Sequence, residues 1–158
     1  MNQLDEHSRE ILRKLQKNCK LAVAEIASAI ESPPSTVYAK VKRMEAEGLI
    51  KAYKTVLDAK QLGRGTTAFI LAAFAYRPPG VEKPLSQREI AAKVAEFPEV
   101  QEVHIITGDW DMLIKVKAKD VEAVGQFVID KIRAVKGIDK TLTCMVFESV
   151  KETTDINI

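Results

Sequence analysis

The residues with the most distinctive chemistry lie in the stretch Ser32–Ile50, which has the sequence SPPSTVYAKVKRMEAEGLI. On a helix that turns by about 100° per residue, one side is apolar and carries Val37, Val41 and Met44. The opposite side is small, hydroxylic and basic, and its residues are Ser35, Thr36, Tyr38, Ala39, Lys42 and Arg43, with Lys40 at the edge. Cations neutralise phosphates and short polar groups reach base edges, so the pattern indicates a helix that lies in a DNA major groove. A solvated helix surface that is basic by chance would show the same pattern.

The elements around this helix must hold its apolar side. Leu4–Asn18 and Val23–Ile30 both show apolar residues at helical spacing, with Asp5 as the expected cap of the first helix. Ser32 is the expected cap of the third helix, and Gly48 the residue that ends it. Residues 1–50 are therefore predicted to form a helix-turn-helix domain. We expect residues 51–65 to form an extended strand, Leu49–Leu57, followed by a hinge that contains Gly63 and Gly65.

The second half of the chain has a different pattern, which we assign to residues 66–158. Four strands and two helices are expected in the order βαββαβ, which is the ferredoxin-like arrangement. The expected elements are a strand at 67–76, a loop at 77–85, a helix at 86–97, strands at 100–107 and 111–117, a helix at 120–135 and a strand at 139–150. Ser86 and Asp120 are the expected helix caps.

The first and last of these strands are apolar on both faces, although two helices can cover only one face of the sheet. An antiparallel sheet with one face in water alternates polar and apolar residues, and a large exposed apolar patch is unusual. We expect the second face to pack on the same face of another copy, which gives a two-fold homodimer. The alternative is that the N-terminal domain covers this face.

Taken together, the two halves resemble the Lrp/AsnC or "feast/famine" family of transcription regulators. LDEHSREIL at the start, STVYAKVKRMEAEGLIKAY in the third helix and its exit, and FPEVQEVHIITGDWDMLIKV in the second half are similar to family motifs in order and spacing. Two departures are Lys40, where the family usually has Arg, and Pro33, where Ser is usual. The resemblance implies an α+β fold with an N-terminal winged helix-turn-helix followed by a ferredoxin-like domain. It also implies double-stranded DNA as a partner, a free amino acid as effector, and homodimers that assemble further into an octamer.

The loop between the two middle strands is the expected ligand site. A free amino acid needs a carboxylate for its ammonium group and N–H or hydroxyl donors for its carboxylate. Such groups occur in two places, at Gly108, Asp109, Trp110 and Asp111 in the loop and at Thr141 and Thr143 in the last strand. In the resembled family effectors bind near the corresponding loop. A purely structural hairpin turn is the alternative reading, and the roles of His104 and Trp110 stay open, with a packed, hydrogen-bonded histidine the simpler interpretation.

Composition restricts the other function classes. The net charge is only +2, but residues 1–63 carry 11 Lys and Arg against 8 Asp and Glu, whereas residues 64–158 carry 13 against 14. This modest basic excess at the front is consistent with nucleic-acid binding. The sequence shows no metal-ligand spacing, no cofactor motif, no signal peptide and no apolar run long enough for a membrane span. We therefore expect a cytoplasmic protein with two buried or half-buried thiols, Cys19 and Cys144.

Three functions follow from these observations. The leading one is a sequence-specific DNA-binding transcription regulator whose assembly or DNA affinity responds to an amino acid. An architectural DNA-coating protein without an effector is the alternative, and it would bind with steep salt dependence and little sequence preference. An enzyme is disfavoured because no nucleophile–base pair or phosphate loop is present, and Asp109 and Asp111 are the only clustered acids in a candidate cleft.

Overall fold

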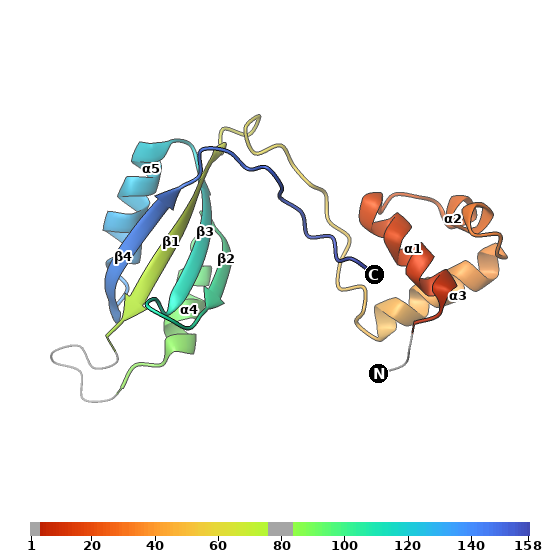
Figure 1. Ribbon diagram of the computed structural model, residues 1–158, viewed down its shortest axis with the longest axis horizontal. Coiled ribbons are helices and arrows are strands. Elements are labelled where there is room, and N and C mark those ends of the chain that lie inside the picture. Colours follow the sequence, from red (N-terminus) through yellow and green to blue (C-terminus); the bar gives the residue numbers. More distant parts are fainter. Residues whose placement is uncertain (1–3, 76–83) are drawn as a thin grey trace. The chain divides into compact units, whose positions relative to one another are not determined.

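The computed structural model describes residues 4–75 and 84–158. The chain divides into two compact units (Figure 1). One unit contains the helices of the N-terminal half up to Val56 together with Lys151–Ile158, and the other spans Leu57–Val150. The α+β class, with a helical N-terminal unit and a four-stranded C-terminal sheet, is as predicted.

Three helices form the first unit, and their bounds are α1 Glu6–Lys17, α2 Val23–Ala29 and α3 Pro34–Ala46. Asp5 caps α1 as expected, because its carboxylate accepts the backbone N–H of Ser8 at 2.9 Å. Ser32 does not cap α3. The cap position is Pro33 and Pro34 is the first helical residue, a position where the missing N–H of proline is tolerated.

The apolar sides of the three helices meet in one small core. Its buried members are Ile11, Leu12, Ile26, Ala27, Val37, Val41 and Met44. Gly48 lies just after the end of α3 and has a φ of 71°, the left-handed conformation that a glycine at this position predicts. The core therefore fixes which side of α3 faces solvent.

The second unit is a four-stranded antiparallel sheet with the order β2-β3-β1-β4. The strands are β1 Thr66–Phe74, β2 Val100–Ile105, β3 Met112–Ala118 and β4 Ile138–Met145. The helices are α4 Gln87–Ala95 and α5 Val121–Gln126, capped by Ser86 and Asp120 as predicted. This order and direction are those of the predicted ferredoxin-like arrangement.

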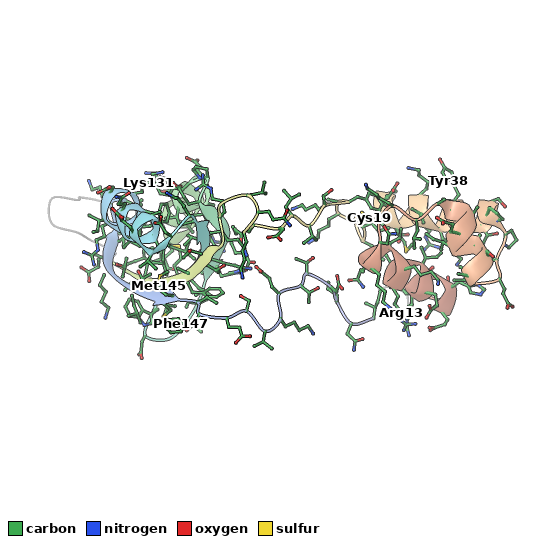
Figure 2. The ribbon with its side chains drawn as sticks, turned by 90° about the horizontal axis from the view of Figure 1, so that it is seen from above. Arg13, Cys19, Tyr38, Lys131, Met145 and Phe147 are labelled. Atoms are coloured by element: carbon green, nitrogen blue, oxygen red, sulfur yellow. The ribbon has the colours of Figure 1, made fainter. Side chains whose placement is uncertain are left out.

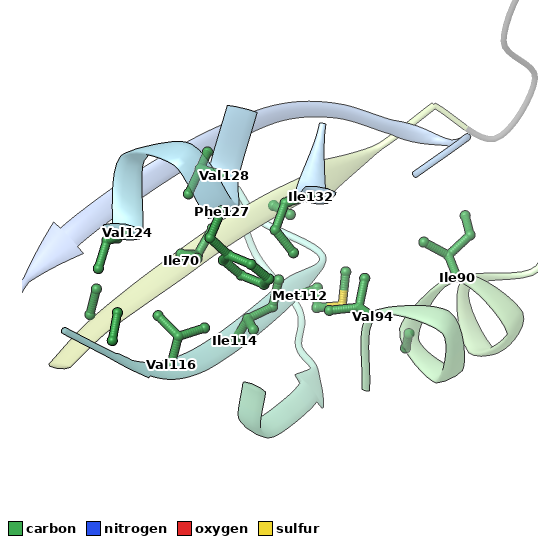
Figure 3. Close-up of a cluster of buried hydrophobic side chains, with 14 of the residues drawn as sticks. Ile70, Ile90, Val94, Met112, Ile114, Val116, Val124, Phe127, Val128 and Ile132 are labelled. Carbon is green, nitrogen blue, oxygen red and sulfur yellow. The ribbon is translucent and has the colours of Figure 1, made fainter. Parts of the chain in front are cut away.

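Both helices pack on the same face of the sheet, where alternate strand residues form the core (Figure 3). Ile70, Met112, Ile114 and Val116 from the strands are fully buried against Ile132 and its neighbours from the helical side. A segment that the sequence did not distinguish lies here, because α5 continues directly into a π-helical turn, η1, at Phe127–Ile132. The wider turn places Phe127, Val128 and Ile132 in the core.

Three sequence predictions on element bounds need correction. Residues 51–57 form no strand, since they pair with no strand of the described chain, and β4 ends at Met145 rather than Val150. The expected hinge contains a closed turn, in which the Asp58 carboxylate accepts the backbone N–H groups of Lys60 and Gln61 at 2.9 and 3.2 Å. The predicted loop at 77–85 lies mostly outside the described residues.

The unit boundaries also differ from the predicted ranges 1–50, 51–65 and 66–158. Residues 151–158 belong to the helical unit, because they contact α1 instead of extending the sheet. Both cysteines are free and exposed, contrary to the expectation of buried or half-buried thiols. Cys19 lies in the turn after α1, and Cys144 lies on the uncovered side of β4, opposite Phe69.

Candidate nucleic-acid interface and ligand loop

The solvent side of α3 is built as its sequence pattern predicts. Val37, Val41 and Met44 are buried in the helical core. The residues on the other side are exposed, and we refer to Ser35, Thr36, Tyr38, Ala39, Lys42 and Arg43 as the basic face. Tyr38 points away from the core with 55% of its surface exposed, and the Lys42 ammonium lies 5.8 Å from the centre of its ring (Figure 2). A shallow depression on this face is lined by Ser35, Thr36, Ala39, Lys40 and Arg43.

Each cation of α3 is paired with an acid. The Nζ of Lys42 lies 2.8 Å from the Glu45 carboxylate and the Nε of Arg43 lies 2.7 Å from that of Glu47. These pairs raise the pKa of Lys42 and of Arg43. Exposed ion pairs contribute little net energy, so phosphates can replace these acids at small cost.

Lys40 has a different environment from the other two cations. It is half-buried, and its Nζ lies 2.6 Å from the Asp5 carboxylate at the start of α1. This hydrogen bond, followed by the one from the Ser8 N–H, lowers the pKa of Asp5 from 3.8 to about 2. Lys40 therefore links α3 to α1, and only Lys42 and Arg43 project fully from the basic face.

The predicted ligand loop, Gly108–Asp111, is held at one end of the sheet. The Asp111 carboxylate accepts the Phe74 backbone N–H at 2.9 Å and the Gln87 side-chain amide at 3.3 Å. The Asp111 backbone N–H donates to the Ala72 carbonyl at 3.0 Å. Asp111 thus fixes the loop to the end of β1 and to α4, whereas Asp109 is exposed and Gly108 has a φ of 122° that favours glycine.

Trp110 and the two threonines lie on different sides of β4. The Lys140 ammonium lies 5.0 Å from the centre of the Trp110 ring, and Lys140 is paired with Ala73, which belongs to the side of the sheet without helices. Thr141 and Thr143 share one face, as expected, but they pair with Ala72 and Ile70 on the helix-covered side. Arg133 donates to the Thr141 hydroxyl at 3.4 Å. Trp110 therefore contacts Lys140 on the side of the sheet without helices, whereas Thr141 and Thr143 lie on the helix-covered side.

The partners of these residues are only partly indicated by the sequence. The pairs Lys42–Glu45 and Arg43–Glu47 have i,i+3 and i,i+4 spacing, which is a readable signal on a helix. The Asp5–Lys40 pair and the Lys140–Trp110 contact join residues 35 and 30 positions apart, so no local pattern indicates them. His104 is not packed as expected: its side chain is exposed and lies 3.3 Å from Glu102.

The side of the sheet without helices is apolar at its centre. Leu113, Leu71 and Leu142 form a row across β3, β1 and β4, and Phe69, Ala73 and Cys144 lie beside it. We call these six residues the open face. None of the six is buried within the described chain, and 46% of the Leu142 surface is exposed.

Two features associated with other functions do not occur in the described residues. Among residues 4–75 and 84–158, no three His, Cys, Asp or Glu side chains are grouped so that they could hold a metal ion. In the same part of the chain, no helix has the length and apolar character needed to cross a membrane.

Comparison with known proteins gives matches over both units. The family model for the Lrp/AsnC ligand binding domain matches residues 81–156, and that for a winged helix-turn-helix DNA-binding domain matches residues 4–51. An uncharacterized HTH-type transcriptional regulator from Pyrococcus abyssi is 40% identical over 149 residues, which cover 94% of this chain and 96% of the relative. The HTH-type transcriptional regulator FL11 from Pyrococcus furiosus is 32% identical, with coverage of 98% and 97%.

A solved structure with a similar fold is a transcriptional regulator from Neisseria meningitidis in complex with L-Met. Its TM-score is 0.89 with 26% identity, and the alignment covers 98% of this chain and 97% of that one. The similarity extends over the helical unit, the connecting residues and the sheet.

Proposed function

This chain belongs to the Lrp/AsnC family of DNA-binding transcription regulators, and from that premise we propose that it binds specific DNA sequences through α3 and responds to a free amino acid. The family consists of transcription regulators and not of enzymes. The observation that carries the proposal is the basic face, whose hydroxyls, aromatic ring and two projecting cations stand clear of the core.

The basic face supplies the two kinds of contact that specific DNA binding needs. Lys42 and Arg43 neutralise phosphates or reach guanine once they leave Glu45 and Glu47. Ser35, Thr36 and Tyr38 contact phosphates or base edges from the first turns of the helix. Because the acids already offset part of the charge, affinity depends on correct placement of the polar groups more than on charge alone.

A homodimer supplies the second copy of α3. The open face is the surface for this contact, because two such faces bury the row of leucines against each other. A dimer then presents two copies of α3 to half-sites about 10 bp apart or a multiple of that distance. The family resemblance extends this assembly to an octamer.

The amino-acid effector binds at the loop Gly108–Asp111. Support comes from the exposed Asp109 carboxylate, which suits an ammonium group, and from the loop shape that Asp111 fixes through Phe74 and Gln87. Trp110 with Lys140 forms an adjacent wall of the site. Thr141 and Thr143 lie on the opposite, helix-covered face of β4, so in this proposal they support the strand that carries Lys140 instead of contacting the ligand beside Trp110. The L-Met complex of the Neisseria meningitidis protein supports an amino acid as the ligand class.

Two measurements test this function. A mobility-shift assay uses the upstream region of the protein's own gene and an unrelated fragment of equal length, each with and without amino acids. A specific regulator prefers the upstream region, whereas equal affinity for both fragments and a steep salt slope would favour an architectural protein. A thermal-shift screen of the twenty amino acids then identifies the effector, and stabilisation by none of them would contradict the ligand proposal.

A further inference from the structure

An extended segment after the sheet packs against the first helix of the DNA-binding unit. The Gln16 side-chain amide donates to the Ile156 carbonyl at 3.0 Å, and the Gln16 carbonyl oxygen accepts the Ile156 N–H at 2.7 Å. The Nε of Arg13 donates to the backbone oxygen of Ile158 at 2.7 Å. Two neighbouring side chains of α1 therefore hold the backbone of residues 156–158, in the manner of a paired strand.

The docking position on α1 is formed by side chains that are themselves held. The Arg13 guanidinium bonds to Glu10 and to Glu6, and these two bonds hold its orientation. The Ile158 side chain is partly buried and packs against the core of the helical unit. An apolar anchor and three backbone hydrogen bonds together indicate a specific contact rather than a chance one.

This segment is covalently continuous with the sheet. Directly after β4, the Val146 N–H donates to the Thr67 carbonyl at 3.0 Å. Residues 147–150 follow, with Phe147 and Val150 almost fully exposed, and the chain then enters the helical unit (Figure 2). The DNA-binding unit is thus connected to the sheet by two stretches of chain, the one after α3 and the one after β4.

We propose that residues Ile156–Ile158 act as a strap, a second connection that limits how far the DNA-binding unit moves from the ligand-binding sheet. The chain from Ile50 to Thr66 alone permits a separation of about 45 Å between its ends, because residues 59–64 are closed in a turn and the remaining residues can extend. The ten residue steps from Val146 to Ile156 permit at most about 35 Å. The docked strap therefore sets the tighter limit and confines both copies of α3 in a dimer.

The strap also connects the proposed ligand site to the DNA-binding unit. Thr141, Thr143 and Lys140 belong to β4, and β4 is the strand that continues into residues 147–158. A ligand that alters β4 is linked through this segment to α1, and α1 is joined to α3 by the Asp5–Lys40 pair. This part of the inference rests on the proposed function, because it assumes an effector at the loop and DNA at α3.

The experiment compares four forms of the full chain. These are the parent, a variant that ends at Asp155, the point variant Gln16→Ala and the control Asn157→Ala. Asn157 lies in the same segment with an exposed side chain, so its loss leaves the docking bonds in place. Gln16→Ala removes both bonds to Ile156 without shortening the chain, and it keeps the test decisive if the shortened variant folds poorly.

Hydrogen exchange tests the docking itself. The strap predicts faster exchange, by about tenfold or more, at the Ile156 amide in Gln16→Ala and at α1 amides in the shortened variant. Asn157→Ala should match the parent. Equal exchange in all four forms would overturn the proposal, and this readout needs neither DNA nor ligand.

DNA binding tests the consequence. Fragments with two half-sites and with one half-site are compared, because the strap limits the search of the second α3 for its site. Without the strap we expect about a tenfold loss on the paired fragment and less than threefold on the single one. Equal losses on both fragments would overturn the role in confinement. If the parent itself shows no sequence preference or amino-acid response, the proposed function fails, while hydrogen exchange still decides whether the strap docks.

Discussion

At the scale of single residues, the cations of α3 have two different roles. Lys42 and Arg43 are exposed and pair with acids on their own helix, whereas Lys40 is half-buried and joins α3 to Asp5. A sequence pattern treats the three as one basic cluster. The structure separates two candidate DNA contacts from one residue that positions the helix.

Replacing Lys42 or Arg43 by alanine should weaken DNA binding. Each change removes a phosphate or guanine contact, so we expect a loss of about 5- to 50-fold in affinity and a shallower dependence on salt. Fluorescence anisotropy with labelled DNA at several salt concentrations measures both. Lys93→Ala, which removes an exposed cation from α4 in the other unit, is the control and should bind as the parent does.

The Asp5–Lys40 pair should make the stability of the helical unit depend on acid pH. The pKa of Asp5 is about 2 in the folded protein against 3.8 ordinarily, so its contribution is complete above about pH 4 and disappears as the pH falls toward 2. Asp5→Asn keeps a capping side chain but has no charge. Thermal unfolding should give the parent a higher Tm than Asp5→Asn at pH 6 and nearly the same Tm at pH 2. A difference in Tm that stays constant with pH would contradict this role.

At the scale of elements, local patterns predicted the helices and strands because each carries its own caps and periodicity. Asp5, Ser86 and Asp120 each cap the helix that their sequence context indicated. The ends of two predicted strands were wrong because pairing, which is not local, determines them: residues 51–57 and 147–150 have no partner strand in the described chain. The π-helical turn at Phe127–Ile132 also has no local signal, since it depends on how its side chains fit the core.

Substitutions of the two acids of the loop, Asp109 and Asp111, should affect different properties, namely ligand binding and stability. Asp111→Asn weakens the bonds to Phe74 and Gln87, so we expect a loss of about 1–3 kcal/mol in the free energy of unfolding. Asp109→Asn changes an exposed carboxylate and should leave stability within about 0.5 kcal/mol of the parent. Denaturant unfolding measures this difference. In the presence of the effector found by thermal shift, Asp109→Asn should lose most of the stabilisation, and retention of the full shift would exclude Asp109 as the ammonium partner.

At the scale of the whole molecule, the arrangement of the ligand residues was only partly predictable. The sequence placed Thr141 and Thr143 on a common face of one strand, and the register confirms this. It did not show that this face is the helix-covered one while Trp110 contacts Lys140 on the other side, because that depends on which strands are neighbours. The apolar residues on both faces of β1 did predict that the side of the sheet without helices is apolar.

A charge in the open face should prevent self-association. Leu142→Asp places a carboxylate in the row formed with Leu71 and Leu113, where a second copy would bury it without a partner. We expect a shift from dimer or larger species to monomer in sedimentation at micromolar concentration. Val121→Asp, at an exposed position of α5, is the control and should sediment as the parent does. An unchanged sedimentation coefficient for Leu142→Asp would place the contact elsewhere.

The docking of Ile158 on α1 also affects how the protein is handled in the laboratory. Because the domain order along the chain suggests that residue 158 belongs to the ligand-binding half, a purification tag fused there would ordinarily be considered remote from DNA. The structure places that fusion point against α1, where the Arg13 side chain bonds to the Ile158 backbone and the Ile158 side chain packs against the helical core. Fluorophores or affinity handles attached after Ile158 would crowd the DNA-binding unit, and an internal site such as Lys93 in α4 is the safer place for a label.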